Sequence, residues 1–165
     1  MAKVFWITGL SGSGKSFIAS EFVRLHKEKS IPVISLDGDV LREVFGNQFG
    51  YSKEERLKAA KQYARLCKML AEQNINVICA TISLFHEIHD WNRKNIDDYV
   101  EIFISADLDA IKKIDVKKIY DQKLKPVMGI DIEPEFPQKP DFIIENSFDK
   151  EANDAVKNIF DSTAN

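Results

Sequence analysis

The stretch Gly9-Leu10-Ser11-Gly12-Ser13-Gly14-Lys15-Ser16 decides the fold predicted for this chain. It fits the pattern of a glycine-rich loop that wraps a phosphate group: Gly, four residues, Gly-Lys-Ser/Thr. The apolar run Val4-Phe5-Trp6-Ile7-Thr8 precedes it and is typical of a buried strand. Phe17 to Leu25 follow, with apolar residues at helical spacing. A strand, a glycine loop and a helix in this order are the context that a phosphate-binding loop requires.

The residue types of this loop suit the chemistry of phosphate binding. Its three glycines lack a Cβ, so the backbone can turn tightly and approach a phosphate closely. The amides of residues 12–16 would point inward, at the positive end of the helix that follows. Lys15 would bridge the β- and γ-phosphates, and the Ser16 hydroxyl would bind Mg²⁺.

Composition predicts one ordinary globular domain covering residues 1–165, since 44% of residues are hydrophobic and 30% are charged. The formal net charge of −3 argues against a nucleic-acid partner. Cys67 and Cys79 lie in apolar segments and are expected to be buried free thiols in a reducing compartment. No apolar run reaches membrane-spanning length, and the first strand leaves no room for a signal peptide. We therefore expect a cytoplasmic protein without a membrane partner.

Strands and helices are expected to alternate along the chain. Further strands are predicted at 33–36, 76–82, 99–104 and 141–145, and further helices at 40–45, 52–73, 84–93, 107–114 and 150–160. Asp39 is expected to cap the first of these helices, and Ser52 with Glu55 forms a capping box for the second. The alternation predicts an α/β fold with a parallel five-stranded sheet and helices on both faces. Residues 115–140 show no clear periodicity and are expected to form a functional or mobile loop.

Polar residues cluster where the predicted strands end, which is where ligands bind in open parallel sheets. The chain lacks the Asn-Lys-x-Asp motif of guanine-specific proteins, and no later strand ends in an Asp suited to bind magnesium. Asp37 or Asp39, after the second strand, is therefore the candidate to orient Mg²⁺ and to accept a proton from an attacking hydroxyl. The alternative for Asp39 is that it only caps the short helix.

These residues together resemble the adenylyl-sulfate kinase (APS kinase) family of P-loop kinases. The resemblance covers nearly the whole chain and rests on these segments: residues 5–16, Leu36-Asp37-Gly38-Asp39 with Arg42, Phe49-Gly50-Tyr51-Ser52 with Glu55-Arg56, Ile82-Ser83, Asp115 with Lys117 and Tyr120, Gly129-Ile130-Asp131, and 140–147. The family transfers the γ-phosphate of ATP to a ribose 3′-hydroxyl with Mg²⁺. Its members are commonly dimers, so the resemblance implies a homodimer with a lid at about 115–140.

The resemblance also implies a role for each matching residue. The catalytic candidates are Lys15, Asp37 and Asp39, and Mg²⁺ would be held by Ser16 and Asp37. ATP would be bound by Gly9, Ser11, Gly12, Ser13, Gly14, Lys15, Ser16, Phe17 and Lys117. The small nucleotide substrate would be bound by Asp39, Arg42, Tyr51, Arg56, Ile82, Ser83 and Lys125. Within this set, Tyr51 would stack on the substrate base, and the two arginines would hold its phosphate-derived groups.

The departures from the family pattern gather on the substrate side. The Asn that follows Asp-Gly-Asp in the family is Val40 here, and a substrate-binding Asn is replaced by Ala59. The family's Ser-Pro-Tyr-Arg is Ser83-Leu84-Phe85-His86, and residues 125–129 lack the Phe that forms one wall of the adenine site. These losses favour another nucleotide acceptor, with cytidine diphosphoramidate, of a capsule modification pathway, as the leading candidate. The alternatives are adenylyl sulfate itself and a catalytically inactive nucleotide-binding protein.

Overall fold

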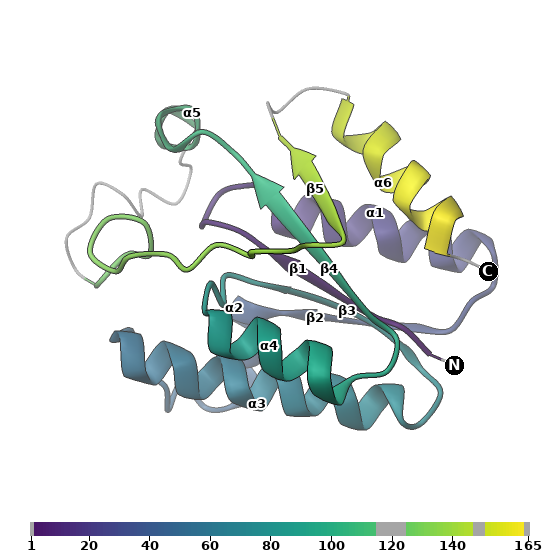
Figure 1. Ribbon diagram of the computed structural model, residues 1–165, viewed down its shortest axis with the longest axis horizontal. Helices are drawn as coiled ribbons and strands as arrows, with labels where there is room; N and C mark the ends of the chain where they lie inside the picture. The colour runs from purple at the N-terminus through teal and green to yellow at the C-terminus, as the bar shows by residue number, and fades with distance from the viewer. Residues whose placement is uncertain (1, 115–124, 147–150, 164–165) are drawn as a thin grey trace.

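A parallel sheet with the strand order β2-β3-β1-β4-β5 organises the chain (Figure 1). The computed structural model describes residues 2–114, 125–146 and 151–163. Its strands are β1 (Val4–Thr8), β2 (Val33–Asp37), β3 (Asn76–Thr81), β4 (Tyr99–Ser105) and β5 (Phe142–Glu145). Its helices are α1 (Lys15–Glu28), α2 (Gly38–Val44), α3 (Lys53–Ala71), α4 (His86–Asn95), α5 (Leu108–Lys113) and α6 (Glu151–Thr163). The predicted α/β P-loop kinase fold with a five-stranded parallel sheet is confirmed.

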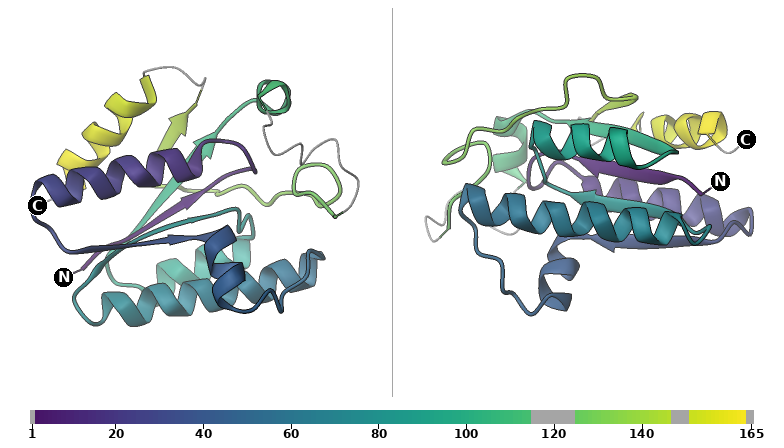
Figure 2. Two further views of the ribbon diagram at one scale, coloured as in Figure 1. Left: turned by 180° about the vertical axis from the view of Figure 1, so that it is seen from behind. Right: turned by 60° about the horizontal axis from the view of Figure 1, so that its bottom comes forward.

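The central strand β1 is buried on both faces, because helices cover the sheet from both sides. Val4 and Trp6 point to the face covered by α2, α3 and α4. Phe5 and Ile7 point to the opposite face, which α1 and α6 cover. Figure 2 shows these two helical layers on either side of the sheet. This arrangement leaves the carboxyl ends of the strands, and the loops that follow them, at one open edge.

Three helices, α1, α2 and α4, start two residues away from the predicted position. Helix α1 begins at Lys15 instead of Phe17, so the last residues of the phosphate-binding motif already belong to its first turn. Helix α4 begins at His86, because Leu84 and Phe85 turn into the core and are almost fully buried. The prediction that Asp39 caps the short helix is wrong: the carboxylate of Asp37 accepts from the Asp39 amide and caps α2.

The capping box at the start of α3 is confirmed, with Ser52 and Glu55 bonding each other's backbone amides. Cys67 and Cys79 are buried free thiols, as expected. A hydrogen bond with Cys67, together with burial, raises the pKa of the Cys79 thiol. Within the described ranges, no helix is both long enough and apolar enough to cross a bilayer.

The far end of the expected lid packs against the glycine loop. Met128 and Ile132 are buried in the same core as Leu10. A Cβ added to Gly129, which has a φ of +92°, would lie 2.9 Å from the Leu10 side chain. Residues 115–124, the first part of the expected lid, lie outside the described residues.

Candidate active site

The glycine loop turns into α1 with its first backbone amides aimed at the open edge of the sheet. Gly12 and Gly14 have φ values of 76° and 97°, which glycine adopts without strain. Gly14 is the N-cap of α1 and has no side chain to bond the amides of the first turn. Lys15 Nζ donates to the Leu10 carbonyl at 2.6 Å, so its side chain lies back across the loop. The loop therefore presents backbone donors and one ammonium group to the same space.

Asn146, directly after β5, holds the glycine loop in place through a hydrogen bond to Ser13. The sequence had suggested no role for it. Its Nδ2 donates to the Ser13 carbonyl at 2.8 Å, and its backbone amide donates to Ser105 at 2.8 Å. A Cβ on Gly14 would lie 2.4 Å from Asn146 Nδ2, so Gly14 is required for this close approach. The available signal was its position: a polar amide at the carboxyl end of a strand two places from β1 in the sheet.

Ser16 and Asp37 form an oxygen pair that fits a magnesium ion. Ser16 Oγ donates to Asp37 Oδ2 at 2.8 Å. Adjacent ligands of octahedral Mg²⁺ are about 3 Å apart, since the metal–oxygen distance is about 2.1 Å. Among the described residues, no cluster of three or more His, Cys, Asp or Glu could hold a metal on its own. The donor set thus suits Mg²⁺, which binds to one or two protein oxygens and completes its shell with phosphates and water.

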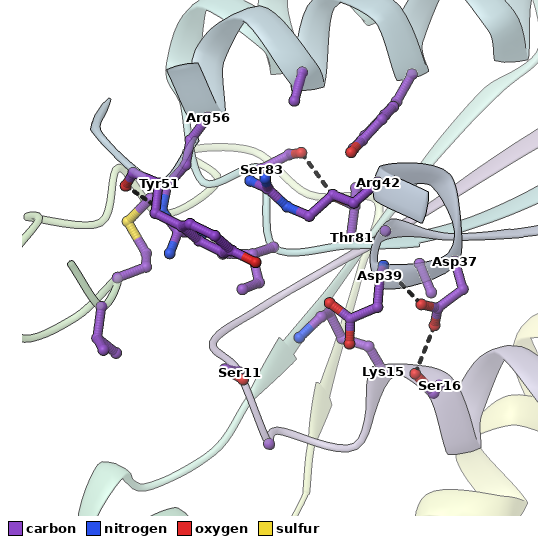
Figure 3. A pocket seen from close by; sticks show the side chains of 18 of the residues that line it. Ser11, Lys15, Ser16, Asp37, Asp39, Arg42, Tyr51, Arg56, Thr81 and Ser83 are labelled. Atoms are coloured by element: carbon purple, nitrogen blue, oxygen red, sulfur yellow. Dashed lines mark hydrogen bonds between the residues drawn. The ribbon is translucent and has the colours of Figure 1, made fainter. Parts of the chain in front are cut away.

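Asp39 lies on the first turn of α2, beside this pair. Figure 3 shows its side chain extending into the pocket on the side of Lys15. Because Asp37 serves as the helix cap, the Asp39 carboxylate is not needed for capping. Its position in the pocket makes it a candidate acceptor for a proton released there.

Three cations converge on the ring of Tyr51. The Arg42 and Arg56 guanidinium carbons lie 4.4 Å and 5.2 Å from the ring centroid, and Lys125 Nζ lies 4.2 Å away. These are distances at which a cation is attracted by an aromatic face. The expectation that Tyr51 stacks on the substrate base stays a prediction.

Backbone carbonyls hold the two guanidinium groups in place. Arg42 Nη1 donates to the carbonyls of Phe49 and Gly50 at 2.8 Å and 3.0 Å. Arg56 Nε donates to Tyr51 at 2.9 Å, and its Nη2 donates to Pro126 at 2.7 Å. No carboxylate of the described ranges forms a salt bridge with either arginine or with Lys125. Burial, and then the charge of Arg42, lower the pKa of Arg56. The cluster is therefore suited to bind an anion.

Ser83 occupies a strained position that the structure holds from two sides. Its φ of 28° is unusual for a residue with a side chain. Its hydroxyl is 2.8 Å from Thr81 Oγ1, and its carbonyl is 3.1 Å from His89 Nε2. Burial lowers the pKa of His89 to about 4, so the ring is neutral at pH 7 and donates from Nε2 to Ser83. This positioning role of His89 was not expected from the sequence.

These residues line one cavity of about 660 Å³ (Figure 3). The predicted site residues that line it are Ser11, Gly12, Gly14, Lys15, Ser16, Phe17, Asp37, Asp39, Arg42, Tyr51, Arg56, Ile82, Ser83 and Lys125. Gly9 and Ser13 belong to the same loop but are buried and do not line the cavity. They pack against each other, since a Cβ on Gly9 would lie 2.8 Å from Ser13 Oγ. Lys117, like Asp115 and Tyr120, lies outside the described residues. Phe85, for which the sequence left pocket lining as one alternative, also lines the cavity, and so do Tyr63 and Thr81, which the sequence had not assigned to a site.

Comparisons with known proteins agree with this geometry. The sequence profile of the adenylylsulphate kinase family matches residues 1–145. The cytidine diphosphoramidate kinase of Campylobacter jejuni subsp. jejuni serotype O:2 is 39% identical over 148 residues, which cover 87% of this chain and 86% of that relative. The adenylyl-sulfate kinase of Gloeothece citriformis is 35% identical over 140 residues, covering 82% and 80%. The Mycobacterium tuberculosis APS kinase in complex with AMPPNP and APS superposes with a TM-score of 0.90 at 28% identity, covering 99% of this chain and 98% of that one.

We expect Gly14→Ala to weaken nucleotide binding at least about 10-fold and to lower the free energy of unfolding by about 1–3 kcal/mol. The new Cβ meets Asn146 Nδ2 at 2.4 Å, at a φ of +97°. Calorimetric titration with an ATP analogue and urea denaturation measure the two effects. Gly46→Ala is the matched control, because its φ is +68° but nothing lies within 4 Å of the added Cβ. It should cost stability without affecting binding, and wild-type affinity in Gly14→Ala would contradict the loop geometry.

We expect stability to depend on pH through His89. Its pKa is about 4 in the folded protein, against an ordinary value of 6.5. Between these values the unfolded chain binds a proton that the folded chain does not, so the free energy of unfolding should fall by about 1–3 kcal/mol as pH drops from 6.5 to 4. His89→Gln keeps a donor for Ser83 and cannot titrate, so its profile should be flatter. Denaturant titrations of both proteins over this range measure the difference, and parallel profiles would refute it.

Proposed function

The chain belongs to the adenylylsulphate kinase family and is a phosphotransferase acting on a nucleotide 3′-hydroxyl; we propose that its acceptor is cytidine diphosphoramidate. We propose ATP as the donor and Mg²⁺ as the metal. The observation that carries the proposal is the single cavity in which the glycine loop faces the cation cluster at Tyr51. A phosphate donor and an anionic acceptor can thus occupy opposite ends of one site.

On the donor side, the proposed mechanism depends on charge neutralisation by groups that are already in place. The amides at the start of α1 and the Lys15 ammonium group would take the β- and γ-phosphates. Ser16 and Asp37 would hold Mg²⁺, which when bound neutralises the charge that develops on the transferred phosphoryl group. Lys117, expected from the lid, would add a further cation. Because phosphoryl transfer needs little covalent help from the protein, positioning and electrostatics supply most of the acceleration.

On the acceptor side, Arg42, Arg56 and Lys125 would bind the 5′-diphosphoramidate group. By binding the 5′ group, these residues would position the ribose 3′-hydroxyl in the cavity. Asp39 would accept the proton as the hydroxyl attacks the γ-phosphate. The Ile82-Ser83 segment and the ring of Tyr51 would then contact the rest of the nucleotide. Among the described residues, the cations at Tyr51 form no salt bridge, so an anion would bind there without breaking one.

Cytidine diphosphoramidate is preferred over adenylyl sulfate for two reasons. The first is the 39% identity to a cytidine diphosphoramidate kinase, against 35% to the adenylyl-sulfate kinase of Gloeothece citriformis. The second is Ala59, whose methyl group lines the cavity and cannot bond to a base. Adenylyl sulfate is the second candidate, because the structural relative with a TM-score of 0.90 binds APS. A homodimer and a cytoplasmic location stay predictions.

The decisive experiment is a coupled assay of ADP release with the two acceptors side by side. We expect kcat/KM for cytidine diphosphoramidate to exceed that for adenylyl sulfate at least about 10-fold. Lys15→Ala should abolish turnover and leave the circular dichroism spectrum unchanged. The opposite preference would overturn the acceptor and leave the reaction standing. If neither acceptor stimulates the release of ADP, the result would support the alternative that the protein binds nucleotides but is catalytically inactive.

We expect Arg56→Gln to raise the acceptor KM about 10-fold to 100-fold and to leave the KM for ATP unchanged. The variant removes a charge-assisted hydrogen bond, which contributes about 1.5–3 kcal/mol. Steady-state kinetics with each substrate varied in turn measure both constants. Lys53→Gln is the matched control on the same helix, because Lys53 is exposed and faces Glu135 at 3.5 Å. Equal effects of the two variants would show that only general charge matters.

A further inference from the structure

Tyr63 lies on α3 one helical turn after Ala59, and both residues line the cavity. The tyrosine is only 3% exposed. Its ring stacks on Phe45, with centroids 6.1 Å apart and planes inclined by 24°. The ring is thus held firmly by packing, which fixes the direction of its hydroxyl group.

The hydroxyl of Tyr63 is buried and has no hydrogen-bond partner among the described residues. Leaving a buried polar group unpaired destabilises a protein, so each such group needs an explanation. Tyr99, which is also buried, shows the ordinary solution: its hydroxyl donates to Glu101 Oε1 at 2.8 Å. The difference between the two tyrosines is that Tyr63 lines the active-site cavity and Tyr99 does not.

The surroundings of Tyr63 suit a nucleobase better than a phosphate. Ala59 and Phe85 contribute apolar surface to the same cavity. The hydroxyls of Thr81 and Ser83 are 2.8 Å apart and bond each other. Burial raises the pKa of Tyr63, so its hydroxyl is neutral at pH 7 and can both donate and accept. An apolar wall with one neutral donor–acceptor matches the edge of a base, which carries both kinds of group.

We propose that Tyr63 is a specificity-determining residue whose hydroxyl hydrogen-bonds to the nucleobase of the acceptor. Ala59, one turn earlier on α3, has only a methyl group and cannot form a hydrogen bond. Tyr63 would therefore be the residue of this turn that bonds to the edge of the base. The class of ligand is a base with a ring nitrogen beside an amino group, as in cytosine or adenine. This inference rests on the proposed function, since it requires a nucleotide acceptor in this cavity.

Tyr63→Phe tests the role, because it removes one oxygen atom and keeps the packing. With the acceptor that the wild-type protein prefers, we expect kcat/KM to fall about 10-fold through KM, while the KM for ATP is unchanged. With an acceptor analogue that lacks the base and keeps the ribose and its 5′-diphosphoramidate, wild type and variant should be equal. The melting temperature should stay the same or rise, since no internal hydrogen bond is lost.

Tyr99→Phe is the matched control for loss of a buried phenol oxygen. It should keep wild-type kinetics with both acceptors and lower the melting temperature, because Glu101 loses a donor. Wild-type kcat/KM in Tyr63→Phe would overturn the inference, and so would an equal fall with both acceptors. If the wild-type protein itself phosphorylates no nucleotide, the proposed function fails and the inference fails with it. The two failures are therefore told apart by the wild-type assay.

Discussion

The carboxylate of Asp37 connects the two helix starts on which the site depends. One oxygen accepts from the Asp39 amide and starts α2, and the other accepts from Ser16 on the first turn of α1. Strands β1 and β2, from which these segments leave the sheet, are separated by β3. This contact fixes the glycine loop relative to the short helix that carries Asp39 and Arg42. Ser16 Oγ and Asp37 Oδ2, 2.8 Å apart, also have the separation expected of two adjacent magnesium ligands, which fits the proposed metal.

The parallel sheet explains why residues far apart in the sequence meet at this point. Every strand ends at the same edge, so residues that follow β1, β2, β3 and β5 line or support one cavity. Local interactions fix the segments that follow the strands: an Asp cap at α2, a Ser–Glu capping box at α3 and a glycine at positive φ in the loop before α1. Each device fixes one segment, and the sheet sets their relative positions.

The phosphate side of this site could be predicted from the residues alone, whereas on the base side the sequence indicated Tyr51, Ile82 and Ser83 only through the family resemblance and did not indicate Tyr63. Gly12, Lys15 and Ser16 are recognised because backbone geometry and charge demand these residue types at fixed spacing. The fold also follows from alternating apolar runs. Asn146 and His89 bond to partners that only the folded chain brings close, and the position of the Tyr63 hydroxyl at the cavity is likewise visible only in the fold. Their spacing in the sequence carries no pattern, and an Asn, a buried His or a Tyr on a helix has many ordinary uses.

The phosphate side and the base side of the site also differ in what they would determine: the first the reaction, the second the choice of acceptor. In the proposed mechanism, the donor side would rely on backbone amides and on Ser16 with Asp37, so we expect changes there to impair phosphoryl transfer. Backbone carbonyls anchor the two arginines of the cation cluster at Tyr51, so the proposed anion site would accept a 5′-anion of suitable length whatever its base. Neither part distinguishes one base from another. In this proposal, discrimination between bases would come from the cavity wall that carries the neutral hydroxyl of Tyr63. A single hydrogen bond from Tyr63 to the base would change selectivity without disturbing phosphoryl transfer, because no hydrogen bond joins Tyr63 to Ser16, Asp37 or the arginines among the described residues.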